Sequence, residues 1–174
     1  MQPLEQARKQ ALRLYRLAFL LTGQADVSAD AAIEAIGLAN DGERSSPNNP
    51  QTQRKMVIKR ALAAVRAELR VSSGRQTFHQ AYDFGAHPIF PRSGLTWTQV
   101  ERALLGIAAF PRCALVLRVL EGLSLNETAA LLGVDAEHIR EAQVAGLRAL
   151  TGSLRRDALI LESVAQRKLV KSLG

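Results

Sequence analysis

The sequence has one cysteine and no hydrophobic run long enough to cross a bilayer. Cys113 stands alone in 174 residues, which excludes an intrachain disulfide and fits a reducing compartment. The longest apolar runs, such as LAFLL at 17–21, are far shorter than the roughly 20 residues that a membrane-spanning helix needs. The opening residues MQPLEQARKQ are polar and lead into no signal-peptide core. We therefore expect a cytoplasmic protein that does not contact the membrane.

Residue patterns that carry enzyme chemistry are also missing from the sequence. The three histidines, His79, His87 and His138, show no metal-ligand spacing with one another or with Cys113. No phosphate-binding glycine loop, HExxH pattern or nucleophile elbow occurs. We expect no catalytic residue, metal, cofactor or small-molecule substrate. Cys113 lies in a very apolar stretch and is expected to be inert core, and Trp97 is expected to be a packing anchor.

Positive charge is abundant but unevenly distributed along the chain. The net charge of +7 and the pI of about 10.3 suggest a polyanionic partner, most often nucleic acid. Residues 1–75 hold 12 Lys/Arg against 7 Asp/Glu, and residues 151–174 hold 5 against 2. Residues 95–150 hold 5 against 6, a net charge of −1. A DNA-binding element within residues 95–150 therefore has no positive net charge of its own.

Apolar residues recur with helical spacing in three N-terminal segments, 4–21, 26–39 and 52–71. Thr22 and Gly23 are expected to end the first helix, and Asp26 or Ser28 to cap the second. NDGERSSPNNPQ at 40–51 is typical of a loop. The third segment carries a basic face, formed by Arg54, Lys55, Lys59, Arg60, Arg66 and Arg70.

The periodicity fails from Ser72 to about Gly94, where Pro, Gly and Ser residues interrupt the pattern. Helical spacing returns in a segment from residue 95, in PRCALVLRVLEGL from 111, and over 124–133, 136–150 and 153–172. No stretch alternates like a strand. The sequence therefore predicts an all-α fold of two small helical bundles joined by a linker. We place the bundles at 1–72 and 95–174, the linker at 73–94, and expect each bundle to fold independently.

Residues 124–150 carry the pattern of a helix-turn-helix. Ser124 and Glu127 form a capping box, Gly133 permits the tight turn, and Asp135 can cap the second helix. Ala129 is small where the two helices must cross. We expect the core between the two helices to be formed by Val134, Ile139 and Leu147.

With the preceding helix included, PRCALVLRVLEGLSLNETAALLGV at 111–134 resembles region four of sigma-70-family factors, especially the short extracytoplasmic-function class. The shared elements are Pro111 and Arg112, EGLS at 121–124, Glu127, Ala129 and LGV at 132–134. LYRLAFLLTG at 14–23 is similar to the opening helix of region two in that family. The resemblance covers roughly residues 10–72 and 95–150, and is specific in region four and weak in region two.

The resemblance implies a protein that binds core RNA polymerase and directs it to promoter DNA, with an anti-sigma factor as a possible further partner. Region two recognises and melts the −10 element in the family, and region four reads the −35 element. Asp30 and Glu34 fall where the family carries the acidic residues that grip the polymerase clamp. Ile33 stands where the family usually has a glutamine, and would add apolar contact there.

Two segments depart from the family pattern. RKMVIKRALAAVRAELR at 54–70 has no aromatic residue to stack a flipped base, and Ala61 stands near the usual asparagine. The basic face is kept and can contact phosphate. In the presumed recognition helix, Ala142 and Ala145 align with two usual arginines, and Gly146 replaces a usual alanine.

The recognition helix leaves three candidate DNA contacts, His138, Arg140 and Gln143. Glu137 and Glu141 either accept hydrogen bonds from cytosine N4 or form a solvated face that repels phosphate. We therefore expect weak binding of duplex DNA by this section alone. Two functions remain open: a working sigma factor with an unusual promoter, or a degenerate sigma-like regulator that acts by protein–protein contacts without melting promoters.

Overall fold

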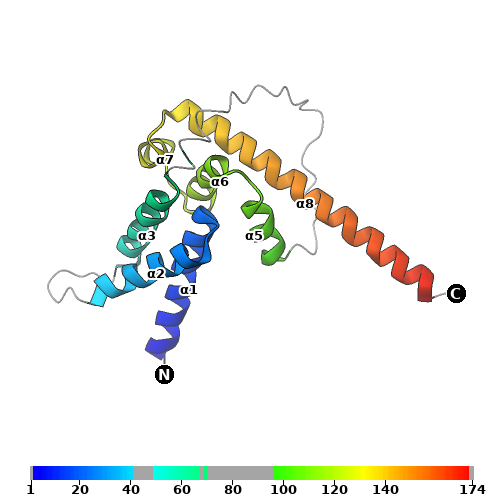
Figure 1. The fold of residues 1–174 in the computed structure, drawn as a ribbon, viewed down its shortest axis with the longest axis horizontal. Helices are drawn as coiled ribbons and strands as arrows, with labels where there is room; N and C mark the ends of the chain where they lie inside the picture. The colour runs from blue at the N-terminus through cyan, green and yellow to red at the C-terminus, as the bar shows by residue number, and fades with distance from the viewer. Residues whose placement is uncertain (1, 41–48, 67–68, 70–95, 173–174) are drawn as a thin grey trace.

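A computed structural model describes residues 2–40, 49–66, 69 and 96–172, and their side chains except in 2–4, 38–40 and 161–172. The elements are α1 (Gln2–Thr22), α2 (Ala25–Asn40), α3 (Pro50–Ala64), α5 (Trp97–Leu105), α6 (Ala109–Leu115), the π-helical η1 (Val116–Leu120), α7 (Leu125–Leu132) and α8 (Ala136–Ser172) (Figure 1). These ranges contain no strand, so the predicted all-α fold class is confirmed. The predicted linker at 73–94 lies outside the described residues.

The three N-terminal helices pack pairwise around one apolar core. Gly23, in the left-handed conformation at φ 71°, ends α1 as the sequence predicts and lets the chain turn into α2. Asn49 caps α3, because its Oδ1 accepts a hydrogen bond from the Gln51 N–H at 2.9 Å. The innermost side chains are Leu14, Ala18, Leu21, Ala31, Ala35, Val57 and Ala61, each at most 1% exposed.

The expected cap of α2 by Asp26 or Ser28 is wrong. The helix already begins at Ala25, so both residues lie inside its first turn, and Ser28 is fully buried. Its hydroxyl lies 3.0 Å from that of Thr22 and donates to the Gln24 carbonyl. A buried hydroxyl needs such partners, and Ser28 therefore joins the end of α1 to the start of α2.

In the C-terminal part, α8 packs across α6 and contacts α5 and α7 (Figure 1). The expected separate helices at 136–150 and 153–172 form one continuous helix, α8. Thr151 does not break it, because its hydroxyl donates to the Leu147 carbonyl at 2.9 Å inside the same helix. The last turns of α8 extend beyond the other helices (Figure 1).

The predicted core between the last helices is only partly right. Ile139 is fully buried and Val134 is half-buried, but Leu147 is 46% exposed. Gly146 takes the inward position instead, where α8 meets the backbone of α6. Cys113 is buried as expected.

The apolar stretch from Pro111 does not stay helical and buried to its end. After α6, the chain widens into η1, in which the Glu121 N–H donates to the Val116 carbonyl, five residues earlier, at 3.0 Å. Val119 and Leu120 are 58% and 43% exposed rather than buried. The wider turn brings Glu121 to face α3.

One buried core joins the N-terminal and C-terminal helices. Arg112, at 6% exposure, donates from Nη2 to the Leu21 carbonyl of α1 at 3.4 Å. Its Nη1 donates to the Leu105 and Ile107 carbonyls at the end of α5, at 3.2 and 3.1 Å. The Cys113 thiol also donates to the Leu21 carbonyl. The two halves thus pack together, while their independent folding stays a prediction.

The close approach of α8 to α6 makes a stability prediction. A Cβ built on Gly146 lies 2.9 Å from the Pro111 carbonyl oxygen, so Gly146→Ala must push the two helices apart. We expect a loss of about 1–3 kcal/mol in the free energy of unfolding, measured by urea denaturation.

Gly152→Ala in the same helix is the matched control. A Cβ at Gly152 meets nothing within 4 Å, so the helix-favouring alanine should stabilise the protein by about 0.5–1 kcal/mol. Equal effects of both substitutions would contradict the close packing at Gly146.

Candidate nucleic-acid and partner surfaces

The residues predicted to bind polymerase lie together on the outer side of α2. Asp30 and Glu34 are exposed, and Ile33 is 68% exposed, which is high for a large aliphatic side chain. The Glu34 carboxylate forms an ion pair with Arg60 of α3 at 3.2 Å. Two residues assigned by sequence to different partners are therefore neighbours. Both are well exposed, so the pair is weak and either group can be taken over by a partner.

The basic face of α3 is only partly free. Arg54 is ion-paired with Glu121, and Arg60 with Glu34. Lys55, Lys59 and Arg66 are exposed, whereas Arg70 lies outside the described residues. Lys59 and Arg66 line a groove of about 360 Å³ between α3 and α7, whose other wall includes Leu131, Gly133 and Val134. The sequence predicts these cations on one surface of α3. In the structure two of them, Lys59 and Arg66, face α7 across this groove.

Arg54 and Glu121 form the best-defined ion pair between the two halves. The guanidinium donates from Nε and Nη2 to Glu121 Oε2, at 2.9 and 2.7 Å. The Glu121 side chain is 11% exposed and that of Arg54 is 39% exposed. Two charge-assisted hydrogen bonds in a largely dry setting are worth more than a surface pair.

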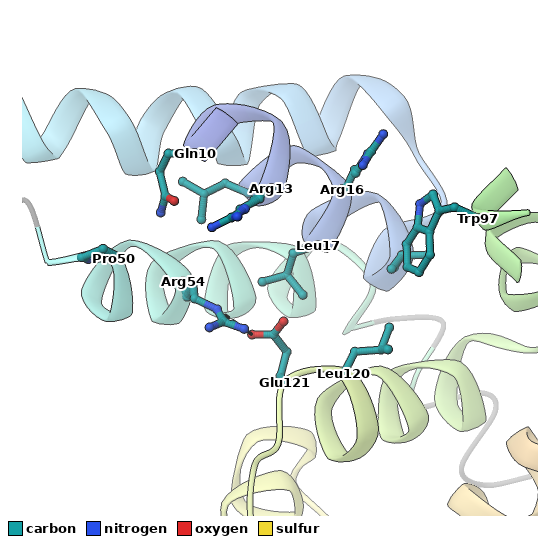
Figure 2. A pocket seen from close by; sticks show the side chains of 11 residues that line it. Gln10, Arg13, Arg16, Leu17, Pro50, Arg54, Trp97, Leu120 and Glu121 are labelled. Atoms are coloured by element: carbon teal, nitrogen blue, oxygen red, sulfur yellow. Dashed lines mark hydrogen bonds and ion pairs between the residues drawn. The ribbon is translucent and has the colours of Figure 1, made fainter. Parts of the chain in front are cut away.

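This ion pair lies beside a groove of about 400 Å³ between α1, α3 and the C-terminal helices (Figure 2). Leu17 and Leu120 supply apolar lining, and Arg13 and Arg16 belong to the α1 side. Trp97 also lines the groove and is 44% exposed, so it is less enclosed than the packing anchor expected from the sequence.

The turn between α7 and α8 has the predicted local geometry. The Ser124 hydroxyl accepts from the Glu127 N–H, and the Glu127 carboxylate accepts from the Ser124 N–H at 2.8 Å, which completes the capping box. Gly133 adopts φ 70° at the end of α7. Asp135 caps α8, because its Oδ1 accepts from the His138 N–H at 2.9 Å.

Two of the predicted DNA contacts on α8 already have partners within the helix. The Arg140 guanidinium donates to Glu137 at 2.6 Å, so its charge is balanced one turn away. The His138 ring lies 2.8 Å from Asp135 Oδ2. That hydrogen bond, helped by the carboxylate charge, raises the pKa of His138. Gln143 is half-buried, whereas His138 and Arg140 are exposed.

Two of the three positions that the resemblance aligns with polar DNA-contacting residues are buried, and the third, Ala145, is half-buried. Ala142, aligned with a usual arginine, is 0% exposed, and Ala61, near the usual asparagine, is also 0% exposed. A long polar side chain at either position would have to displace core atoms. These departures are therefore consistent with the packing, and any DNA contact must come from other residues.

Two functional contacts were not found from the sequence. Glu121 was recognised only as part of a motif, and nothing in the sequence pairs it with Arg54, 67 residues away. Arg112 was assigned to a helix start, yet it is buried and joins three helices. A cation inside the apolar run PRCALVL was the available signal, because a buried charge must be satisfied by other groups.

The described residues hold no cluster of three His, Cys, Asp or Glu side chains that could bind a metal ion. Within the same residues, no helix is long and apolar enough to span a membrane.

The Asp135–His138 pair makes a pH prediction. Asp135 holds the pKa of His138 above its ordinary 6.5, and its hydrogen bonds to His138 hold its own pKa below 3.8. The raised histidine pKa contributes stability that is present below pH 6.5 and is lost as pH rises through the folded value. The lowered pKa of the Asp135 carboxyl contributes stability that is present above pH 3.8 and is lost as pH falls through the folded value.

We expect an NMR titration to give His138 a pKa above 6.5 in the native chain and a value closer to 6.5 in Asp135→Asn. Asparagine keeps a capping oxygen, so the helix start is preserved while the charge is removed. An unchanged His138 pKa in the variant would show that Asp135 is not its cause.

Comparison with known proteins gives one structural likeness. No family model matches the chain, and no curated protein matches it. The fold is similar to that in the co-crystal structure of the sigma factor RpoE in complex with the anti-sigma factor NepR from Bartonella quintana, with a TM-score of 0.53. The match covers 87% of this chain and 95% of that chain at 18% sequence identity. At this identity the likeness shows that the chain has the fold of a sigma factor.

Proposed function

We propose that this protein is a sigma-factor-like transcription initiation protein, which binds core RNA polymerase and directs it to promoter DNA. The observation that carries the proposal is the fold shared with a sigma factor over 87% of the chain. The capped α7–turn–α8 unit supports it, because this is the local geometry of a DNA-reading helix-turn-helix. In this proposal the protein works in the cytoplasm as a polymerase partner, and is not an enzyme itself.

The proposed polymerase contact is the exposed group of Asp30, Ile33 and Glu34 on α2. Two carboxylates around a well-exposed aliphatic side chain form a small surface suited to a basic partner with an apolar centre. Glu34 can exchange its exposed ion pair with Arg60 for a pair across the interface.

The proposed DNA contacts divide between α3 and α8. Lys55, Lys59 and Arg66 supply charge for phosphate, while His138 and Arg140 lie in the first turns of α8, where a recognition helix meets base edges. The pairing of Arg140 with Glu137 lowers the free positive charge of that helix. Binding of duplex DNA by residues 95–150 alone is therefore proposed to be weak, with polymerase supplying a high effective concentration.

A second candidate function is a sigma-like regulator that acts by protein contacts and does not melt promoters. The absence of aromatic residues from α3 and the balanced charge of the first turns of α8, residues 136–150, favour it. An anti-sigma factor is a possible partner in either case, since the similar sigma factor was solved with one.

Run-off transcription separates the two candidates. Purified core polymerase with this protein should produce discrete transcripts from genomic fragments of the source organism. Polymerase binding without transcripts would support a regulator that acts on polymerase. No binding to polymerase would exclude the first candidate and leave only a regulator that acts through another protein, such as an anti-sigma factor.

A charge reversal tests the proposed polymerase contact. Asp30→Lys with Glu34→Lys should abolish co-purification with core polymerase, because two attractive charges become repulsive, while helical circular dichroism is unchanged. The matched control reverses two other exposed acids, Glu5→Lys with Glu141→Lys, and should still co-purify. Retained binding by the α2 variant would contradict this site.

A further inference from the structure

We propose that the groove beside Trp97 is a binding site for a small organic anion with an aliphatic body, such as a medium-chain carboxylate. The groove has a volume of about 400 Å³ and lies between α1, α3 and the C-terminal helices (Figure 2). That volume is in the range of small-molecule pockets, roughly 300–1,000 Å³. The inference goes beyond the proposed function and does not depend on it.

The lining of the groove is mainly aliphatic. Leu14, Leu17 and Leu20 of α1 line it, and each of them is at most 7% exposed. Figure 2 shows Leu17 on the α1 side and Leu120 on the η1 side of this space. Leu120 is 43% exposed, so a ligand that covers it would remove apolar surface from water. An apolar ligand body therefore fits this lining.

Trp97 adds an exposed aromatic wall to the groove. A capping box fixes the start of α5, because the Gln99 N–H donates to Thr96 Oγ1 at 3.3 Å and the Thr96 N–H donates to Gln99 Oε1 at 2.7 Å. Trp97 is the first residue of that helix, lines the groove and is 44% exposed. The indole is thus held at a defined place, yet nearly half of the residue is open to solvent or to a ligand.

The groove carries a positive net charge. Its charged lining residues are Arg13, Arg16 and Arg54 against Glu121, three positive and one negative, which gives +2. Glu121 balances Arg54 through two hydrogen bonds, at 2.9 and 2.7 Å, so the surplus belongs to the exposed Arg13 and Arg16. Figure 2 shows Arg13 extending toward the ion pair, whereas Arg16 extends away from Leu120. We therefore assign the anion to Arg13, with Arg16 adding to the attraction.

The other polar groups of the lining already have partners. Gln10 Nε2 donates to Gln53 Oε1 at 3.2 Å, and Glu121 accepts from Arg54. A nucleobase or a peptide backbone placed against the leucines would leave its own donors and acceptors without partners, which is costly. An aliphatic carboxylate has polar atoms at one end only. It can place them on Arg13 and bury the rest of its chain.

Trp97 is the only tryptophan of the chain, so its fluorescence reports on the groove in the full-length protein. Octanoate should shift the emission saturably. Octanol and octylammonium carry the same aliphatic chain with no charge and with a positive charge. Octanol should bind at least about tenfold more weakly, because a hydrogen bond to a charged group is lost, and octylammonium should not bind. Equal binding of all three compounds would overturn the anion site.

A chain-length series tests the burial of the aliphatic body. Octanoate has two methylene groups more than hexanoate, and its Kd should be lower by about 15-fold if both are buried. Equal Kd values would overturn the apolar lining as part of the site. Adenosine monophosphate supplies an anion with a polar ring instead of an aliphatic chain. Tighter binding of this nucleotide than of octanoate would overturn the choice of an aliphatic body.

A charge-neutral pair of substitutions tests the assigned cations. Arg13→Gln with Arg16→Gln should weaken octanoate binding at least about tenfold, to the level of octanol. The matched control is Arg155→Gln with Arg156→Gln in α8, which removes the same charge at exposed positions outside the groove and should keep the native Kd. Circular dichroism verifies that each variant is folded. An unchanged Kd in the α1 variant would contradict the assignment.

A second variant tests the apolar wall without altering the arginines. Leu120→Glu places a carboxylate in the groove and should abolish octanoate binding by repulsion. Val119→Glu is its matched control, because this neighbour is 58% exposed, does not line the groove and adds the same charge. Octanoate should bind the Val119 variant with the native Kd. Native affinity in a folded Leu120→Glu protein would overturn the site.

Discussion

The arrangement of the whole protein depends on one buried guanidinium. Arg112 lies in the apolar helix α6. Its Nη2 donates to the Leu21 carbonyl of α1 and its Nη1 to the Leu105 and Ile107 carbonyls near the end of α5, while its buried Nε has no hydrogen-bond partner among the described residues. Helix C-termini carry partial negative charge, so they suit a cation. A buried charge without partners is costly, which fixes α1, α5 and α6 relative to one another. The groove beside Trp97 and the meeting of η1 with α3 follow from that arrangement.

Three of the cations predicted to contact DNA, Arg54, Arg60 and Arg140, are held in ion pairs. Arg60 and Arg140 are held by exposed neighbours, Glu34 and Glu137, in pairs that water and salt weaken. Arg54 is held by a carboxylate that is 11% exposed, and that pair resists exchange more strongly. The cations thus differ in how readily they are released, and net charge alone is a poor guide to polyanion binding here.

Local features were predictable from the sequence, and contacts between distant segments were not. Ser124 with Glu127, Gly133 and Asp135 follow from short-range chemistry, and each has the predicted role. The continuity of α8 was missed because helical spacing was recognised separately over 136–150 and 153–172, whereas Thr151 bonds within one continuous helix. Helical periodicity also predicted Leu147 in the core. It cannot detect that Gly146, which has no side chain, lets α8 approach the backbone of α6 and so takes the inward position. The partners of Arg54 and Arg112 depend on tertiary packing, which a single sequence does not reveal.

The length of α8 has a mechanical consequence. Leu154 is the last buried side chain of α8 among those described up to residue 160, and from there to Ser172 the helix continues for 18 residues, or about 27 Å at 1.5 Å per residue. It is continuous with the turns that follow Asp135, so both ends move as one rod. A rotation of 10° about the core would displace the far end by about 5 Å, by the same rise per residue. A reorientation of the capped turn therefore moves the far end of α8 by a similar distance, because the helix extends equally far on either side of Leu154.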